Sequence, residues 1–253
     1  MILRFAFILS FLVVQPALAE PPMRIAVASN YATALKGIVS DYQAAQNDLT
    51  TISVSIGSTG KLYAQIKNGA PFDLFFSADA DRPNDLFAEG FTLEPSQTYT
   101  TGRLVVWHPK LPAGQSVNSL LNNVSRLAIA NPNLAPYGLA AKQTLENLDW
   151  EISEKNQVIT AENVGQVFAM VKTGNVPAGF VALSQMREQQ IPIGQYTLID
   201  EQAHQSIYQG VVQLKNGLQP AQARAFLRYL ISRTGPAPAA NPITPINSEL
   251  IDR

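Results

Sequence analysis

Short apolar runs alternate with amphipathic stretches along most of this chain. The run RIAVAS at residues 24–29 is typical of a buried strand. The segment after it, YATALKGIVSDYQAAQ, places four apolar side chains on one face of a helix, namely Leu35, Ile38, Val39 and Tyr42. Strands and helices in this order predict parallel sheets that are covered by helices.

The same order recurs in two series. The first series continues with the strands TISVSIG and FDLFFSA and the helices KLYAQIKNGA and DRPNDLFAEG. The second series begins after the extended run GRLVVWHP (102–109), with the strands RLAIANP, NQVITA and AGFVAL and the helices YGLAAKQTLENL and NVGQVFAMVKTGN. Near the end, IYQGVVQLKNG and PAQARAFLRYLIS predict one more extended run and one more helix.

Two series joined by extended runs predict two lobes. We assign residues 23–104 and 206–253 to lobe 1 and residues 105–205 to lobe 2, with the final helix packed on lobe 1. The predicted fold class is α/β, in which each lobe is a mainly parallel sheet flanked by helices and the lobes are joined by two crossover strands. Such an arrangement forms a hinged clamp.

The first residues, MILRFAFILSFLVVQPALAE, have the pattern of a secretory signal peptide. Arg4 precedes an apolar run that ends at Val14, and Ala17-Leu18-Ala19 matches the small-x-small motif of a cleavage site. The run is too short to span a bilayer. We therefore expect residues 1–19 to be removed by cleavage near Ala19 and the mature protein to reside in the periplasm.

Composition and charge narrow the classes of partner. The chain has no cysteine, so we expect neither disulfides nor a lipid anchor on a processed N-terminus. Removal of Arg4 with the leader changes the formal net charge from −1 to −2, which does not favour binding to nucleic acid or anionic lipid. A bound anion must therefore be held by local hydrogen-bond donors. We expect a monomer.

Small and polar residues follow four of the predicted strands, where the next helix begins. In open α/β sheets, ligands bind beyond the carboxyl ends of the strands, beside helix N-termini. Hydroxyl, amide, phenol and backbone N–H groups at such turns suit an oxyanion that only accepts hydrogen bonds. The four turns are Ser29-Asn30, Ser58-Thr59-Gly60, Pro136-Tyr137-Gly138 and Asn163-Val164, with Lys61 and Glu162 as the charges beside them.

Two other interpretations of the same residues remain open. The Ser, Thr and Asn residues can serve as helix N-caps, and Tyr137 can be a packed aromatic. Alternatively, Ser58-Thr59-Gly60-Lys61, Ser116-Val117-Asn118 and Lys172-Thr173-Gly174 follow the order of penicillin-recognising serine enzymes. The context favours this enzyme less, because Lys172 is predicted to end a helix with Gly174 as its C-cap, whereas those enzymes place the motif on a strand.

Metal, nucleotide and triad chemistry fit the sequence less well. Asp79 and Asp81 lack the Gly and Glu positions of an EF-hand loop, and we expect them to cap and charge the start of the next helix. The Gly-Ser-Thr-Gly-Lys turn lacks the spacing of a P-loop. His108 and His204 are predicted to be structural or solvated rather than members of a catalytic triad.

The segments around the four turns resemble the periplasmic molybdate-binding component of bacterial ABC transporters. They are VASNYATALKGI, GSTGKLYAQIKNGAPFDLFFSADADRP, LAIANPNLAPYGLAAKQTLENL and AENVGQVFAMVKTGNVPAGFVALS. The resemblance implies a type II periplasmic binding-protein fold that closes on one molybdate or tungstate without a cofactor and delivers it to an inner-membrane ABC permease. It implies no enzymatic activity.

The resemblance also implies a ligand set. Molybdenum is then held as its oxyanion, without direct metal ligands, by Ser29, Asn30, Ser58, Thr59, Tyr137 and the backbone N–H of Val164. Some members of the family carry a ligand tyrosine where this chain has Ala182, and others carry it in the third turn, as here. Lys61 matches no ligand and is expected to face solvent. A sulfate- or thiosulfate-type binder of the same fold is the nearest alternative, and a Ser-x-x-Lys serine enzyme is a distant one.

Overall fold

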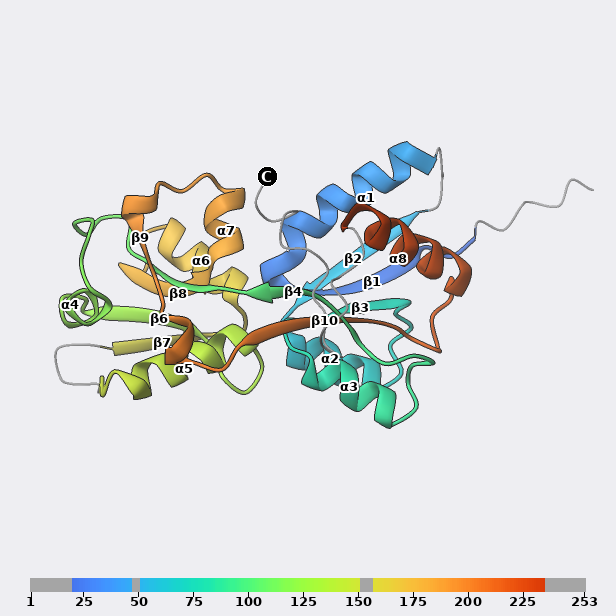
Figure 1. Cartoon of the computed structure of the whole chain (residues 1–253), viewed down its shortest axis with the longest axis horizontal. Coiled ribbons are helices and arrows are strands. Elements are labelled where there is room, and N and C mark those ends of the chain that lie inside the picture. Colours follow the sequence, from blue (N-terminus) through green and yellow to red (C-terminus); the bar gives the residue numbers. More distant parts are fainter. Residues whose placement is uncertain (1–19, 47–50, 151–156, 235–253) are drawn as a thin grey trace, which may run out of the picture.

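The computed structural model describes residues 20–46, 51–150 and 157–234, which form two lobes side by side (Figure 1). Each lobe is built on one five-stranded sheet. The predicted signal peptide with its cleavage site and the Pro-rich segment after the last helix lie outside the described residues. The lobe boundaries assigned from the sequence stay a prediction, and below each lobe is named by its sheet.

Lobe 1 has three parallel strands at one side of its sheet. Its strands are β1 (Met23–Ala28), β2 (Ile52–Gly57), β3 (Leu74–Phe76), β4 (Gln97–Gly102) and β10 (Ile207–Gln213), in the order β2-β1-β3-β10-β4. β1 runs parallel to β2 and β3, whereas β10 runs antiparallel to β3 and β4. The helices of this lobe are η1 (Ser29–Tyr31), α1 (Ala32–Gln46), α2 (Thr59–Lys67), α3 (Asp81–Ala88) and α8 (Pro220–Thr234).

Lobe 2 repeats this plan. Its strands are β5 (Leu104–Trp107), β6 (Arg126–Ala130), β7 (Gln157–Ala161), β8 (Ala178–Ala182) and β9 (Tyr196–Leu198), in the order β7-β6-β8-β5-β9. β6 runs parallel to β7 and β8, and β5 runs antiparallel to β8 and β9. The helices are α4 (Val117–Asn122), α5 (Pro136–Asn147), α6 (Val164–Lys172), α7 (Leu183–Glu188), η2 (Ile193–Gln195) and η3 (Glu201–Ala203).

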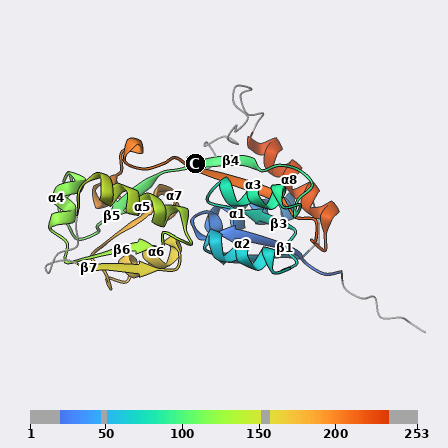
Figure 2. The same ribbon diagram turned by 90° about the horizontal axis from the view of Figure 1, so that it is seen from below.

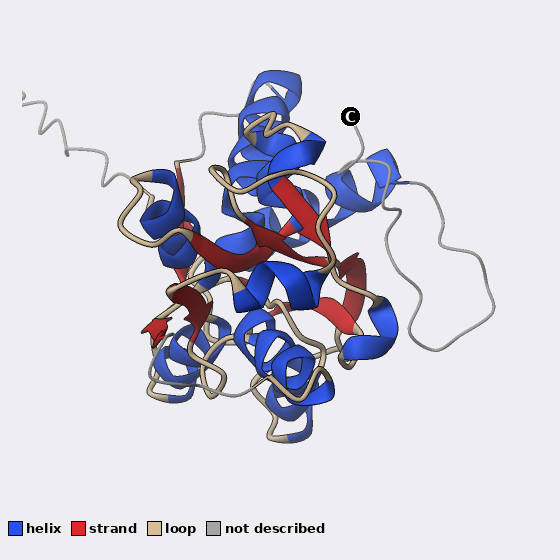
Figure 3. Ribbon diagram, turned by 90° about the vertical axis from the view of Figure 1, so that its left-hand side faces the viewer, coloured by secondary structure: helices blue, strands red, loops and turns tan. Residues whose placement is uncertain are grey.

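The apolar pattern explains how the elements pack. Leu35, Ile38, Val39 and Tyr42 of α1 are all buried, as the helical spacing predicts. Helices surround the strands when the molecule is seen along its long axis (Figure 3). One buried hydrophobic cluster fills lobe 2 around Phe180, and two clusters fill lobe 1. The predicted α/β fold with two helix-flanked sheets is confirmed.

The chain crosses between the lobes twice. A single residue, Arg103, separates β4 of lobe 1 from β5 of lobe 2, and the chain returns between β9 and β10 (Figures 1 and 2). The final helix, α8, then buries Ala223, Phe226 and Leu230 in the core of lobe 1, as predicted. Within the described ranges, no helix is both long enough and apolar enough to cross a membrane.

Candidate functional site

The first and fourth turns meet across the two lobes. The Ser29 hydroxyl follows β1 and accepts a hydrogen bond from the backbone N–H of Gly165 in α6, at 3.1 Å. Asn163 caps α6, because its Oδ1 accepts from the N–H of Gln166 at 3.1 Å. Val164 is the first residue of this helix, where a backbone N–H has no acceptor within the helix. The Ser29 hydroxyl proton and the Val164 N–H are thus donors on opposite lobes.

The second turn lies beside the first because β1 and β2 are paired neighbours. Ser58 caps α2, with its Oγ accepting from the backbone N–H of Lys61 at 3.4 Å. The Thr59 hydroxyl accepts from the backbone N–H of Ala78 at 3.1 Å. Both side chains are buried. Since each hydroxyl is used as an acceptor by a backbone N–H, its proton remains to be donated.

The second turn also contacts lobe 2. The backbone N–H of Gly60 donates to the Leu134 carbonyl at 2.8 Å. At the same rim, Lys61 Nζ lies 2.9 Å from Glu162 Oε2, and Arg82 Nη2 donates to the Asn133 carbonyl at 3.1 Å. The Lys61 side chain is 53% exposed, so it faces solvent as predicted, but it also forms an ion pair between the lobes.

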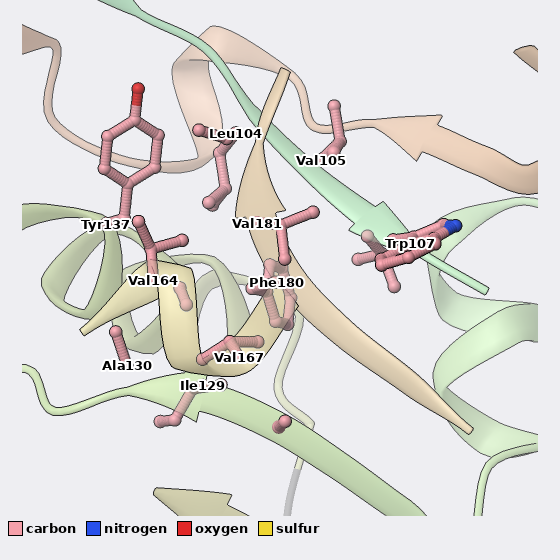
Figure 4. Close-up of a cluster of buried hydrophobic side chains, with 14 of the residues drawn as sticks. Leu104, Val105, Trp107, Ile129, Ala130, Tyr137, Val164, Val167, Phe180 and Val181 are labelled. Atoms are coloured by element: carbon pink, nitrogen blue, oxygen red, sulfur yellow. The ribbon is translucent and has the colours of Figure 1, made fainter. Parts of the chain in front are cut away.

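Tyr137 of the third turn is the second residue of α5 and is 3% exposed. Its hydroxyl accepts a hydrogen bond from Gln209 Nε2 of β10 at 3.3 Å. Burial raises the pKa of the Tyr137 phenol, so the group stays protonated at neutral pH. Figure 4 shows Tyr137 at the edge of the lobe 2 core, with its hydroxyl pointing away from Val164 and Phe180.

Two glycines allow close approaches in the surroundings of Tyr137. A Cβ at Gly138 would overlap the carbonyl of Ala130, so glycine allows the start of α5 to approach the end of β6. A Cβ at Gly102 would overlap the Tyr137 hydroxyl and would come within 2.9 Å of Gln209 Nε2. The crossover between the lobes therefore needs a residue without a side chain where it passes Tyr137.

Asn30 joins the same group of side chains. Its Nδ2 donates to Gln209 Oε1 at 2.8 Å, and its backbone carbonyl accepts from the Ser184 hydroxyl at 3.2 Å. Gln209 and Ser184 were not foreseen from the sequence. The available signal for Gln209 was a glutamine near the middle of a largely apolar strand, IYQGVVQ. A cleft of about 330 Å³ adjoins Asn30, Tyr137 and Gln209.

The structure thus brings the four turns together between the lobes. Ser29 meets α6, the second turn meets the loop before α5, and Asn30 and Tyr137 share Gln209. The donors are neutral hydroxyl, amide and N–H groups, which suit an anion that only accepts hydrogen bonds. That these residues contact such an anion stays a prediction.

The motifs of the serine-enzyme alternative have other surroundings. Ser58 Oγ contacts the backbone of Lys61, whereas the ammonium group of Lys61 is paired with Glu162. Ser116 caps α4 by accepting from the N–H of Ser119 at 3.2 Å. Lys172 ends α6, and Gly174 follows with a φ of 76°. Lys172 thus ends the helix as predicted, but the C-cap is Thr173, and Gly174, the predicted C-cap, comes one residue later.

The acidic motif serves the fold. Asp79 accepts from the backbone N–H of Arg82 at the start of α3 and also pairs with the Arg82 guanidinium, and Asp81 is the first residue of that helix. Burial raises the pKa of the Asp79 carboxyl, and Arg82 partly offsets this shift. Across residues 20–46, 51–150 and 157–234, no group of three or more His, Cys, Asp or Glu residues could hold a metal ion.

Both histidines are structural. His108 is fully buried, with its Nε2 3.0 Å from the Thr197 hydroxyl. His204 is also buried, with its Nδ1 2.7 Å from the carbonyl oxygen of Gln205. Neither contact includes a serine or a carboxylate, so neither histidine is part of a Ser-His-acid arrangement.

Similarity to known proteins agrees with this geometry. The chain is 35% identical over 212 residues to the molybdate-binding protein ModA of Azotobacter vinelandii, which covers 82% of this chain and 83% of that protein. It is 34% identical over 182 residues to the ModA of Rhodobacter capsulatus, covering 71% of each chain. The solved structure of the Azotobacter vinelandii periplasmic molybdate-binding protein superimposes with a TM-score of 0.77 at 31% identity, over 85% of this chain and 93% of that chain.

These relatives confirm the resemblance that the four segments indicated. In addition, residues 23–240 match the family described as bacterial extracellular solute-binding proteins, which includes all four turns and both sheets. The chain belongs to this family of bacterial extracellular solute-binding proteins.

Proposed function

We propose that this protein captures molybdate, and also tungstate, in the periplasm and delivers it to an ABC permease for import. The observation that carries the proposal is the meeting of four turns from two lobes, each of which offers neutral hydrogen-bond donors. The relatives named as molybdate-binding proteins supply the identity of the anion.

The proposed contacts use protons that the fold leaves available. The hydroxyls of Ser29, Ser58 and Thr59 each accept from a backbone N–H, so each is oriented with its own proton free for an anion oxygen. Val164 offers its backbone N–H at a helix N-terminus, where the helix dipole favours negative charge. A dianion held by such donors needs no cationic side chain.

Closure of the lobes is the proposed capture step. In the structure, direct hydrogen bonds join the lobes at Ser29, Gly60 and Tyr137, all of which lie in the four turns. An anion that contacts donors on both lobes binds the closed form more tightly than the open one and therefore shifts the population toward closure. The closed protein is then the form that docks on the permease.

The first test is isothermal titration of the mature protein after it has been freed of ligand by unfolding and refolding. Molybdate and tungstate should bind tightly with one-to-one stoichiometry, and sulfate, thiosulfate and phosphate should not. Binding of sulfate or thiosulfate in place of molybdate would change the substrate but keep the binding class. Absence of binding by every anion would refute the proposal, and a β-lactam acylation test on Ser58 would follow.

Delivery needs a separate test in the native organism. Deletion of this gene should reduce the uptake of labelled molybdate when molybdate is scarce, and should reduce it less at high molybdate. Unchanged uptake at low molybdate would contradict the role in import, while leaving the titration result intact.

A further inference from the structure

Gln209 is a buried amide at the centre of the candidate site. It lies in β10 and is 2% exposed. Its Oε1 accepts from Asn30 Nδ2 at 2.8 Å and lies 3.0 Å from the Tyr99 hydroxyl. Its Nε2 donates to the Tyr137 hydroxyl at 3.3 Å. One side chain of lobe 1 therefore contacts two residues of the predicted ligand set.

We propose that Gln209 is a positioning residue that makes Tyr137 a hydrogen-bond donor to the bound anion. A phenol has a single proton, and it can also accept. Because Tyr137 accepts from Gln209 Nε2, it keeps its proton for another acceptor. An oxyanion has no proton to donate, so a tyrosine can contact it only in this donor state. The inference rests on the proposed function above.

The contact with Asn30 holds the Gln209 amide in this orientation. If the amide were reversed, its oxygen would face Tyr137 and would accept the phenol proton. Its NH₂ group would then face Asn30 Nδ2, which is itself a donor. The Tyr99 hydroxyl lies 3.0 Å from Gln209 Oε1 and 3.2 Å from the Ser77 carbonyl, so its single proton has two acceptors and does not by itself fix the amide. Asn30 therefore sets which way the Tyr137 proton points.

The surroundings make this orientation matter. Asn30, Tyr137 and Gln209 are all almost fully buried, so bulk water does not compete freely for their hydrogen bonds. Gly102 leaves the space in which the Tyr137 hydroxyl and Gln209 Nε2 meet. Because Gln209 belongs to lobe 1 and Tyr137 to lobe 2, the donor state of Tyr137 is set only when the lobes are closed.

The first test compares two substitutions at Gln209. Gln209→Glu keeps the size and shape of the side chain, but its carboxylate can only accept and would take the proton of Tyr137. Gln209→Leu removes all polar contacts. An orienting role predicts that molybdate affinity falls by about tenfold in Gln209→Leu and further in Gln209→Glu. A role in packing alone predicts that Gln209→Glu loses only what its added negative charge costs against the anion, a loss that stays the same in a Tyr137→Phe background.

A second comparison asks whether Gln209 acts through Tyr137. In a Tyr137→Phe background, Gln209→Leu should reduce molybdate affinity by clearly less than it does in the wild-type protein. The matched control is Gln213→Leu, the same change in the same strand, where the Gln213 side chain instead donates to the Pro220 carbonyl at 2.9 Å. This control should leave molybdate affinity unchanged.

The outcomes separate this inference from the proposed function. If the wild-type protein does not bind molybdate, the proposed function fails first. Two results would overturn the orienting role once the wild type is shown to bind molybdate. One is that Gln209→Glu binds molybdate as tightly as the wild type. The other is that Gln209→Leu lowers molybdate affinity by the same factor in the wild-type and Tyr137→Phe backgrounds. Circular dichroism checks the fold of each variant. If either variant fails to fold, Gln209→Asn is tested instead, because its shorter side chain withdraws the amide from Tyr137. Its molybdate affinity should fall by about tenfold, and an unchanged affinity would equally overturn the orienting role.

Discussion

Replacement of Thr59 by valine separates the structural role of this hydroxyl from its proposed role in binding. Thr59 is 1% exposed, and the next residue, Gly60, contacts the other lobe through its backbone N–H. The hydroxyl itself accepts from the Ala78 N–H at 3.1 Å. Valine has nearly the same shape but neither accepts nor donates a hydrogen bond.

Thr59→Val should lower both the stability of the fold and the affinity for molybdate. The buried N–H of Ala78 loses its acceptor, which should lower the free energy of unfolding by about 1–3 kcal/mol. The anion loses one hydrogen bond from the hydroxyl, which is worth about 1.5–3 kcal/mol to a charged group. This second effect corresponds to a loss of affinity on the order of 10- to 150-fold.

The two effects are measured independently. Urea unfolding of the ligand-free protein gives the stability, and isothermal titration with molybdate gives the affinity. Thr59→Ser is the matched control, because it keeps the hydroxyl and should retain most of the affinity. If Thr59→Val lowers stability as expected but binds molybdate like the wild type, the hydroxyl only supports the turn around Ala78, and the reasoning about its free proton is refuted.

Three further perturbations test the site and the fold. Tyr137→Phe should weaken molybdate binding by about 1–3 kcal/mol in titration, because a buried donor is removed, and an unchanged affinity would leave Tyr137 with a packing role only. Lys61→Ala should change the free energy of molybdate binding by less than about 1 kcal/mol, since the pair with Glu162 is largely exposed. High salt should weaken molybdate binding less in the variant than in the wild type. A tenfold change in affinity at low salt would contradict this expectation. Burial lowers the pKa of His108, so the unfolded chain binds the proton more readily, and stability should fall as the pH drops below about 6.5. His108→Gln should show a smaller fall in urea unfolding between pH 7.5 and 5, and an identical pH profile would exclude His108 as a source of the effect.

Elements with a clear apolar period could be predicted from the sequence, and elements without one could not. The strand at β6 and the helix at α6 follow from runs of apolar residues at the spacing of each structure. β4 was not predicted, because Gln97–Gly102 reads QTYTTG and carries its buried positions on threonine and tyrosine. It is nevertheless an edge strand of the lobe 1 sheet, held there by pairing with β10. That pairing depends on residues more than a hundred positions away.

The same limit applies to the candidate site. Strand-to-helix turns locate Ser29, Ser58 and Thr59, because the carboxyl ends of parallel strands share one edge of a sheet. Nothing local to Tyr137 indicates that its hydroxyl meets Gln209, since the two residues come from different lobes. The ion pair between Lys61 and Glu162 was missed for the same reason. Contacts between lobes follow from how the lobes close, which a one-dimensional pattern does not contain.

The hydrogen bond from Gly60 to Leu134 has a consequence for sequence variation. Both partners are main-chain atoms, so substitutions of side chains along the rim leave this link between the lobes in place. The exception is position 60 itself. A Cβ there would lie 3.1 Å from both the Cα and the carbonyl oxygen of Leu134, and proline would remove the donor altogether. Substitution of the charged residues around the rim can therefore change the surface charge that the closed protein presents to a partner. The closed geometry stays the same, provided that position 60 keeps its glycine.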